Sequence, residues 1–256
     1  MSETVLKVAG VSKRFGGLQA LSGVGIEIKR GQVYGLIGPN GAGKTTFFNV
    51  LTGLYTPDTG SFELAGKPYK PTAVHDVAKA GIARTFQNIR LFAEMTALEN
   101  VMVGRHIRTH SGLLGAMFRT ASFKAEEAAI AQRAQELLDY VGIGKLADYK
   151  SRTLSYGDQR RLEIARALAT DPQLIALDEP AAGMNATEKV MLRELIVKIR
   201  NDNRTILIIE HDVKLMMGLC DRLTVLDYGK QIAEGTPAEV QKNEKVIEAY
   251  LGTSAH

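Results

Sequence analysis

The sequence predicts an α/β fold in which a mostly parallel sheet is flanked by helices, and three observations lead to that prediction. Short apolar runs alternate with helical patterns, which is typical of strands joined by crossover helices. One apolar run, Val33–Ile37, leads directly into a glycine-rich loop. From about residue 96 to 170 the pattern becomes helical, which predicts a helical subdomain inserted into the sheet domain.

The first elements of the chain are expected to be strands. Val5–Phe15 has mixed polarity and ends at paired glycines, and Val24–Lys29 alternates apolar and polar residues as a half-buried strand does. We expect this part of the chain to form an N-terminal antiparallel β subdomain. After the glycine-rich loop, the remaining elements of the first part are a helix at Thr45–Leu54 and short strands at Phe62–Leu64 and Ile82–Phe86.

The second part of the chain continues the alternation of helices and strands. Its expected helices are Ala121–Val141, a helix that begins at Ser155, and Thr187–Arg200; its strands are Leu174–Leu177 and Thr205–Ile209, followed by a hairpin of Leu223–Leu226 and Gln231–Ala233. We therefore divide a single domain, residues 1–256, into a core of about 1–88 and 171–256 and a helical insertion of about 89–170.

Composition excludes several classes of protein. The chain has 256 residues, of which 45% are hydrophobic and 23% charged, so it is not disordered, collagen-like or coiled-coil. A net charge of +4 does not by itself indicate a nucleic-acid partner. The single cysteine, Cys220, cannot form an internal disulfide or a cysteine-rich zinc site. No apolar run is long enough to span a bilayer and none resembles a signal peptide, so we expect a reducing, cytosolic setting.

A phosphate-binding loop is the strongest signal in the sequence. Residues 38–45 read GPNGAGKT, which matches G-x-x-x-x-G-K-[ST] between a predicted strand and a predicted helix. Main-chain N–H groups turn inward around phosphate oxygens there, and a Cβ would block that approach. An ordinary glycine-rich turn would not explain this agreement of residue types, spacing and context. The residues expected to bind the nucleotide are Asn40, Gly41, Ala42, Gly43, Lys44, Thr45 and Thr46, with the Thr45 hydroxyl also expected on Mg²⁺.

Two acidic residues follow the buried run that begins at Leu174. A buried strand that ends in a carboxylate can direct it at an ion bound beside the phosphate loop, so Asp178 is the candidate for Mg²⁺. Glu179 is one residue further on and is the candidate general base for an attacking water. The alternative is a solvated acidic turn that Pro180 ends.

With these two motifs in place, nearly the whole chain resembles the ATP-binding subunits of ABC transporters. Residues 154–161 read LSYGDQRR and are similar to the family signature L-S-G-G-Q, with Tyr156 and Asp158 as departures. The resemblance implies that Ser155 and Gly157 contact the ATP bound by the opposite subunit. The alternative for Ser155 is an ordinary helix N-cap.

The resemblance also implies roles for residues that would not stand out alone. Gln87 matches the glutamine that contacts Mg²⁺ or the lytic water, and His211 matches the histidine that contacts the γ-phosphate. Phe15 falls where the family places an aromatic ring against adenine, although a core aromatic is the alternative. Asn185 stands where the family usually has aspartate, which implies altered communication between the two ATP sites in a direction that the residues do not reveal.

Within the family, the chain looks like the G-type ATPase of bacterial branched-chain amino acid importers. The matching segments are residues 84–92, 104–123, 154–157, 181–185 and the tail 246–252. This implies a P-loop (RecA-like) fold, ATP and Mg²⁺ as cofactors, and ATP hydrolysis coupled to transport at the cytoplasmic face of the inner membrane. The implied partners are a second ATPase subunit in a head-to-tail dimer, two integral membrane permease subunits and, indirectly, a periplasmic or lipid-anchored solute-binding protein, with no nucleic acid.

Other functions remain open at this point. Importers of urea, amides or other amino acids look similar, and a soluble ABC-type ATPase in DNA repair or translation is a further alternative. A GTPase should show an N-K-x-D motif, which the sequence lacks, and a kinase would not need the signature stretch. A nucleotide-gated scaffold without activity is disfavoured by Glu179 and His211. The residues do not identify the solute, the nature of the partner ATPase, or the role of the basic segment near residues 104–124.

Overall fold

The computed structural model describes residues 3–105 and 121–252, without the side chains of 121–124, 251 and 252. Most of the basic segment near residues 104–124 therefore lies outside the described residues. The chain forms two compact units. The larger comprises residues 1–87, 173–183 and 193–256, and the smaller comprises residues 88–172 and 184–192.

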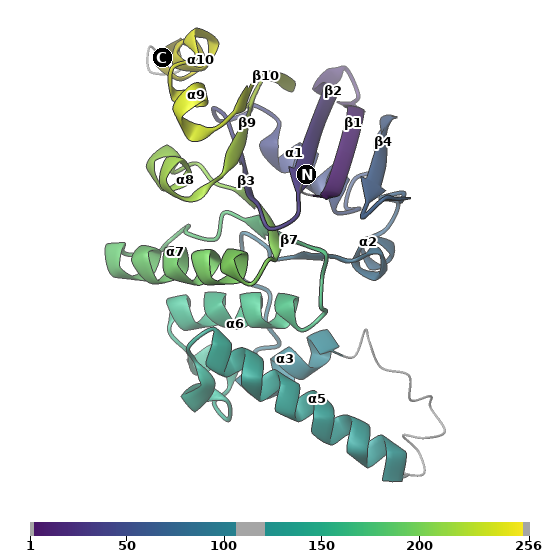
Figure 1. Ribbon diagram of the computed structural model, residues 1–256, viewed down its shortest axis with the longest axis vertical. Coiled ribbons are helices and arrows are strands. Elements are labelled where there is room, and N and C mark those ends of the chain that lie inside the picture. Colours follow the sequence, from purple (N-terminus) through teal and green to yellow (C-terminus); the bar gives the residue numbers. More distant parts are fainter. Residues whose placement is uncertain (1–2, 106–120, 253–256) are drawn as a thin grey trace. The chain divides into compact units, whose positions relative to one another are not determined.

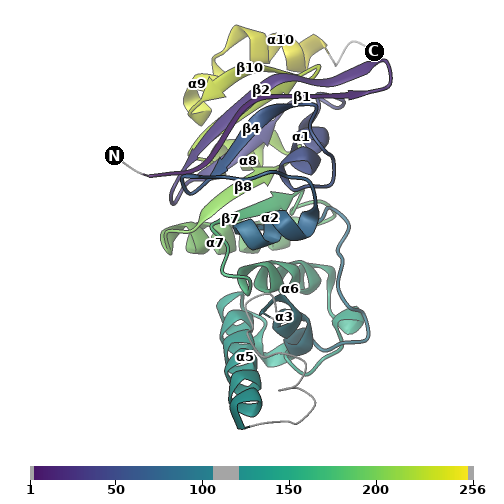
Figure 2. The ribbon, with the colours of Figure 1, turned by 90° about the vertical axis from the view of Figure 1, so that its right-hand side faces the viewer.

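The larger unit contains an antiparallel sheet with the strand order β2-β1-β4-β5. The strands are β1 (Thr4–Phe15), β2 (Leu18–Lys29), β4 (Thr59–Leu64) and β5 (Lys67–Pro68). Figure 2 shows β1 and β2 as one long hairpin. Gly16 turns this hairpin with a φ of 56°, a conformation that costs glycine little. The N-terminal antiparallel subdomain is thus confirmed, with a second strand that starts six residues earlier than we expected.

The second sheet of this unit has six strands in the order β10-β9-β3-β8-β7-β6 (Figure 1). Their bounds are β3 (Val33–Ile37), β6 (Ile82–Arg84), β7 (Leu174–Asp178), β8 (Thr205–Ile209), β9 (Arg222–Asp227) and β10 (Lys230–Gly235). Only the β9–β10 pair is antiparallel. Every residue of β3, β7 and β8 is buried, as expected for parallel strands covered on both faces. The predicted mostly parallel sheet is confirmed.

Helices and strands of the larger unit share one hydrophobic core. The helix after the phosphate loop, α1 (Lys44–Leu51), buries Phe47 and Phe48 in a cluster that also contains residues of both sheets. Four short helices were not predicted from the sequence: α2 (Val74–Ala80), α8 (Val213–Leu219), α9 (Pro237–Gln241) and α10 (Glu244–Gly252). For α9 a local signal existed, because Thr236 and Glu239 form a capping box around Pro237.

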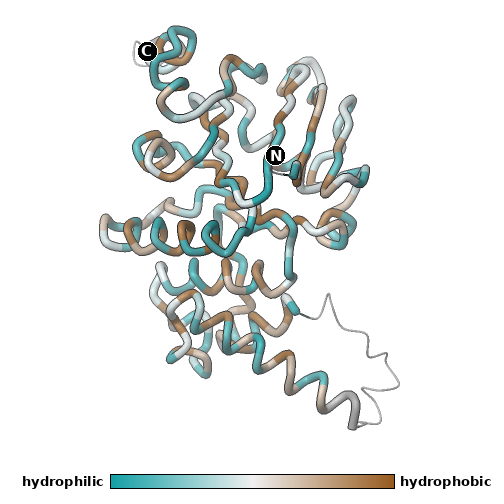
Figure 3. Tube along the Cα trace, in the orientation of Figure 1, coloured by the Kyte–Doolittle hydropathy of each residue, from teal (hydrophilic) through white to brown (hydrophobic). Residues whose placement is uncertain are grey.

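The smaller unit is helical, as expected. It contains α3 (Ala97–Arg105), α5 (Ala121–Tyr140), α6 (Tyr156–Leu168), two short 3₁₀ turns at Gly144–Leu146 and Ser151–Thr153, and the beginning of α7 (Ala186–Asn201). The three complete helices contact one another. Figure 3 shows apolar and polar residues alternating along α5, the pattern of a helix with one buried face. In the part of the chain that the structure describes, no helix is both long and apolar enough to cross a bilayer.

Candidate functional site

The glycine-rich segment forms a tight loop between β3 and α1. Gly38 has a φ of 150°, and a Cβ there would lie 2.1 Å from the carbonyl oxygen of Leu226. Gly43 has a φ of 97°, and its Cβ would lie 2.8 Å from the carbonyl oxygen of Ala20. Because neighbouring backbone atoms occupy both spaces, only glycine allows this loop to sit against β2 and β9 while its N–H groups stay available.

Lys44 stands at the first position of α1, with its ammonium group turned back over the loop. Its Nζ donates to the carbonyl oxygens of Gly38 at 2.7 Å and Pro39 at 2.8 Å. The residue is only 7% exposed. Burial lowers the pKa of Lys44, and the nearby charge of Glu179 opposes that shift. A cation held at the positive end of a helix is suited to receive a polyanion.

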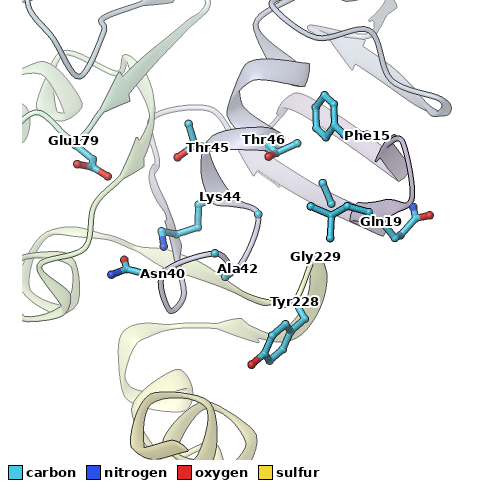
Figure 4. A pocket seen from close by; sticks show the side chains of 14 residues that line it. Phe15, Gln19, Asn40, Ala42, Lys44, Thr45, Thr46, Glu179, Tyr228 and Gly229 are labelled. Atoms are coloured by element: carbon cyan, nitrogen blue, oxygen red, sulfur yellow. The ribbon is translucent and has the colours of Figure 1, made fainter. Parts of the chain in front are cut away.

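A cavity of about 350 Å³ opens over this loop (Figure 4). This volume lies in the range of small-molecule sites. Three parts of the larger unit line it besides the loop: the β1–β2 hairpin, Glu179 after β7, and the turn between β9 and β10. The lining residues are Phe15, Leu18, Gln19, Ala20, residues 40–46, Glu179, Tyr228 and Gly229.

The aromatic ring expected beside the nucleotide base lies at the rim of this cavity. Phe15 is 42% exposed and meets Tyr55 edge to face, with ring centroids 5.2 Å apart. One face of a partly exposed ring is what a planar base needs for stacking. The core-aromatic alternative for Phe15 does not fit this exposure.

The β9–β10 turn is a part of the site that sequence reasoning missed. Gly229 accepts a hydrogen bond from Ser22 N–H at 2.8 Å and donates one to Ala42 O at 3.0 Å, so it joins the phosphate loop to the start of β2. Tyr228 is 84% exposed at the mouth of the cavity. The turn itself, residues 227–230, could be recognised in the sequence. Nothing in the neighbouring residues showed that it contacts the phosphate loop, almost 190 residues earlier.

Asp178 ends β7 and is only 4% exposed. It forms an ion pair with Arg84, whose Nη2 lies 2.7 Å from Asp178 Oδ2. The Arg84 guanidinium also donates to Thr52 Oγ1 at 2.6 Å and stacks over Phe48 at 4.7 Å. In the sequence, Arg84 is only the first residue of the matching segment 84–92. The pairing of β6 with β7 makes it the direct partner of the buried acid.

The three residues predicted to take part in catalysis lie together: Gln87 and His211 are both close to the carboxylate of Glu179. Gln87 Nε2 donates to Glu179 Oε2 at 2.7 Å, and His211 Nδ1 lies 3.8 Å from the same oxygen. Glu179 has a φ of 44°, which is uncommon for a residue with a side chain. Its N–H donates to Ile209 O at 3.0 Å, which holds this turn against the end of β8.

The signature segment belongs to the smaller unit. Ser155 is the N-cap of α6: its Oγ accepts from Asp158 N–H at 3.2 Å and donates to Asp158 Oδ2 at 2.6 Å. Gly157 is buried, and a Cβ there would lie 2.9 Å from Glu188 Oε1. The two departures from the signature therefore have local roles, because Asp158 completes the cap and the Tyr156 hydroxyl accepts from Arg160 Nη2 at 3.3 Å.

Asn185 begins α7 in the same unit. Its Oδ1 accepts from Glu188 N–H at 3.0 Å, while Glu188 Oε2 accepts from Asn185 N–H at 2.9 Å. This reciprocal cap needs one side-chain acceptor at position 185, which asparagine supplies as well as aspartate would. The hydrogen bonds of the cap are therefore kept without the charge of an aspartate.

Family comparisons place these features among known proteins. A family model described as ABC transporter matches residues 21–182, and one described as branched-chain amino acid ATP-binding cassette transporter matches residues 230–256. The chain is 46% identical over 253 residues to BraF of Pseudomonas aeruginosa, a high-affinity branched-chain amino acid transport ATP-binding protein, covering 98% of this chain and 99% of that protein. Identity and coverage are the same for LivG of Escherichia coli K12.

More distant relatives and solved structures agree with the fold. The lipopolysaccharide export ATP-binding protein LptB of Haemophilus influenzae is 33% identical over 97% of this chain and 98% of that protein. The ADP conformation of MJ1267, an ATP-binding cassette of an ABC transporter, has a TM-score of 0.84 at 34% identity over 97% of this chain and 99% of that chain. A dimeric ATP-binding cassette, MJ0796 bound to ADP and Pi, has a TM-score of 0.75 at 26% identity, and the match covers 91% of this chain and 98% of that chain.

Proposed function

Because this chain belongs to the ABC transporter family of ATP-binding proteins, we propose that it hydrolyses ATP to power the import of branched-chain amino acids. Two comparisons support the choice of solute. BraF and LivG of Escherichia coli, both named for branched-chain amino acid transport, are 46% identical to this chain, whereas the lipopolysaccharide export protein is 33% identical. The tail of this chain, residues 230–256, also matches a model named for branched-chain amino acid transporters.

The observation that carries the ATPase assignment is a phosphate loop and a carboxylate, Glu179, that line one cavity. In the proposed binding mode, the loop N–H groups and Lys44 hold the phosphates, and Thr46 contacts the α-phosphate. Adenine stacks on the exposed face of Phe15 at the rim. The remaining proposed nucleotide contacts come from Asn40, Gly41, Ala42, Gly43 and Thr45.

Glu179 acts as the general base in this proposal. A carboxylate that accepts from Gln87 and lies near His211 is held in one orientation, and an attacking water bonded to it would be polarised towards the terminal phosphate. Gln87 orients Glu179 and the water, and His211 contacts the γ-phosphate. The contacts with Gln87 and His211 at the edge of the cavity favour this role over a solvated turn.

The donor set near the loop fits Mg²⁺. Thr45, Asp178 and Gln87 offer hydroxyl, carboxylate and amide oxygens, which suit a hard cation that keeps phosphate oxygens and waters as its other ligands. Among the described residues, no group of three or more His, Cys, Asp or Glu side chains could hold a metal ion. Bound Mg²⁺ would neutralise charge on the β- and γ-phosphates. Asp178 would hold the cation while it keeps its ion pair with Arg84 through Oδ2.

We further propose a head-to-tail dimer. Ser155 and Gly157 stand at the N-terminal end of α6, where helix N–H groups and the helix dipole suit an anion such as the γ-phosphate held by the opposite subunit. A related cassette is dimeric with ADP and Pi bound. The other proposed partners are two membrane permease subunits and a solute-binding protein, which would place the chain at the cytoplasmic face of the membrane.

Substitution of Glu179 tests the ATPase assignment. Glu179→Gln keeps the shape of the side chain and its contact with Gln87 but cannot act as a base, so phosphate release should be abolished while ATP binding remains. Glu63→Gln, an exposed change on β4 of the same unit, is the matched control and should hydrolyse ATP normally. Steady-state hydrolysis by Glu179→Gln at the control rate would contradict the assignment.

The solute is tested separately, on the complex of this chain with its membrane subunits in vesicles that also carry the binding protein. Leucine, isoleucine or valine should stimulate ATP hydrolysis, and urea should not. Stimulation by urea alone would overturn the choice of solute but leave the ATPase assignment intact.

A further inference from the structure

Glu210 is a buried acid for which the proposed function has no use. It follows the last residue of β8 and precedes His211. The residue is 1% exposed, although it lies at the edge of the sheet where Glu179 and Gln87 meet. An ionised carboxylate taken out of water is costly unless both of its oxygens find partners.

The two carboxylate oxygens of Glu210 are used differently. Oε1 accepts from Ala181 N–H at 2.7 Å, which holds the turn after Glu179. Within the described part of the chain, Oε2 is buried and has no hydrogen-bond partner. His211 Nδ1 lies 3.7 Å from Oε2. A normal N–H···O bond spans about 2.9 Å, so an approach of roughly 0.8 Å would complete it.

His211 is free to make that approach, because its side chain is 61% exposed. The competing acceptor is Glu179 Oε2, at 3.8 Å from the same nitrogen. That oxygen already accepts from Gln87 at 2.7 Å. The Glu210 oxygen therefore has more to gain from the imidazole than the Glu179 oxygen has.

We propose that Glu210 is a positioning residue for His211: its buried Oε2 accepts the Nδ1–H of the imidazole, fixes that tautomer and turns Nε2 towards the bound nucleotide. The proposal rests on the proposed function, in which His211 contacts the terminal phosphate. It also leaves Glu179 free to act on water, since the histidine is held by a different carboxylate.

General chemistry supports this arrangement. The hydrogen bond at one imidazole nitrogen decides which nitrogen carries the proton, and an ionised carboxylate can only accept. Burial raises the pKa of Glu210, and the charge of Glu179 adds to that shift, while the backbone N–H groups of Ala181 and His211 and the charge of His211 oppose it. The titratable groups that act on it are His211 and Glu179. A donor from His211 therefore stabilises a charge that burial disfavours.

The test is the tautomer of His211, read by long-range ¹H–¹⁵N NMR on the nucleotide-free full chain. The chain has five histidines, and the signal missing from a His211→Gln variant identifies the one of interest. Wild type should show the Nδ1–H form. Glu210→Gln can keep the bond from Ala181 N–H but offers an NH₂ donor to His211, so the proton should move to Nε2. Glu179→Gln is the matched control and should leave the Nδ1–H form unchanged.

Hydrolysis gives the second readout. Glu210→Gln should lower kcat about 10- to 100-fold, the range found when a partner that orients a metal-bound histidine is lost, with ATP affinity close to wild type and no loss of Tm. An Nε2–H form in wild type, an unchanged tautomer in Glu210→Gln, or an unchanged kcat would overturn the proposal. The tautomer is measured without nucleotide, so it does not depend on ATP hydrolysis. If wild type hydrolysed no ATP, the proposed function would be contradicted, but the role of Glu210 as the acceptor of the His211 Nδ1–H would not be.

Discussion

Arg84→Met tests whether the acid assigned to Mg²⁺ depends on a buried ion pair. The side chains of Arg84 and Asp178 are 9% and 6% exposed, and their charged atoms lie 2.7 Å apart. Methionine has a similar length but no charge, so it would leave the Asp178 carboxylate buried without its counter-ion. Breaking a buried pair in this way costs about 3–5 kcal/mol. The lost bond to Thr52 and the lost stacking on Phe48 act in the same direction.

The assay is thermal unfolding of the nucleotide-free chain, followed by circular dichroism. For a protein of this size each kcal/mol shifts Tm by about 2–4 °C, so Arg84→Met should lower Tm by roughly 6–20 °C. Arg222→Met is the matched control, since its pair with Glu234 is 39% and 29% exposed and such pairs contribute about 0–1 kcal/mol. The double variant Arg84→Met/Asp178→Asn should recover much of the loss, because it removes the uncompensated charge.

An Arg84→Met variant that unfolds within about 2 °C of wild type would refute this reasoning. It would mean that the Asp178 carboxylate finds water or another partner at no cost. A double variant no more stable than Arg84→Met would also count against it, since packing and not charge would then explain the loss.

Three further predictions concern the nucleotide site and the buried acid. Lys44→Ala should weaken binding of a fluorescent ATP analogue, because it removes the cation held over the loop; unchanged affinity would argue against the site. Phe15→Ala should weaken binding of the same analogue by about 1–3 kcal/mol, whereas Phe15→Tyr should keep the wild-type affinity. If Phe15→Ala bound the analogue as tightly as wild type does, stacking would be excluded. Burial raises the pKa of Glu210 above 4.5, so the native state holds that proton more tightly than the unfolded chain does. The free energy of unfolding of wild type, measured by urea titration, should therefore decrease as pH rises from 4.5 through the native pKa of Glu210. Glu210→Gln should not show this decrease.

Many local features of this chain could be predicted because neighbouring residues encode them. The strand Thr205–Ile209 is a run of β-branched and apolar residues, and its observed bounds equal the predicted ones. The helix that follows Ser155 was recognised from its N-terminal residue and its apolar face. The phosphate loop is likewise a local device, since its glycines, lysine and threonine act within eight consecutive residues.

Several neighbours of the site could not be predicted, because they come from distant parts of the chain. Arg84 meets Asp178 only because β6 pairs with β7, 94 residues later. Tyr228 reaches the cavity because Gly229 bonds to both Ala42 and Ser22. Glu210 looked like an ordinary residue at the end of a strand, and only the fold shows that it is buried beside Ala181 and His211.

The sequence by itself determined the longer helices, most of the strands, the phosphate loop and the family resemblance, since periodicity, capping and motif spacing act over a few residues. The tertiary structure decided which acid is paired, which is strained and which is buried. Those properties depend on how far each side chain is buried and on the partners that the sheet brings together. Both are set by residues far apart in the sequence, so neighbouring residues do not reveal them.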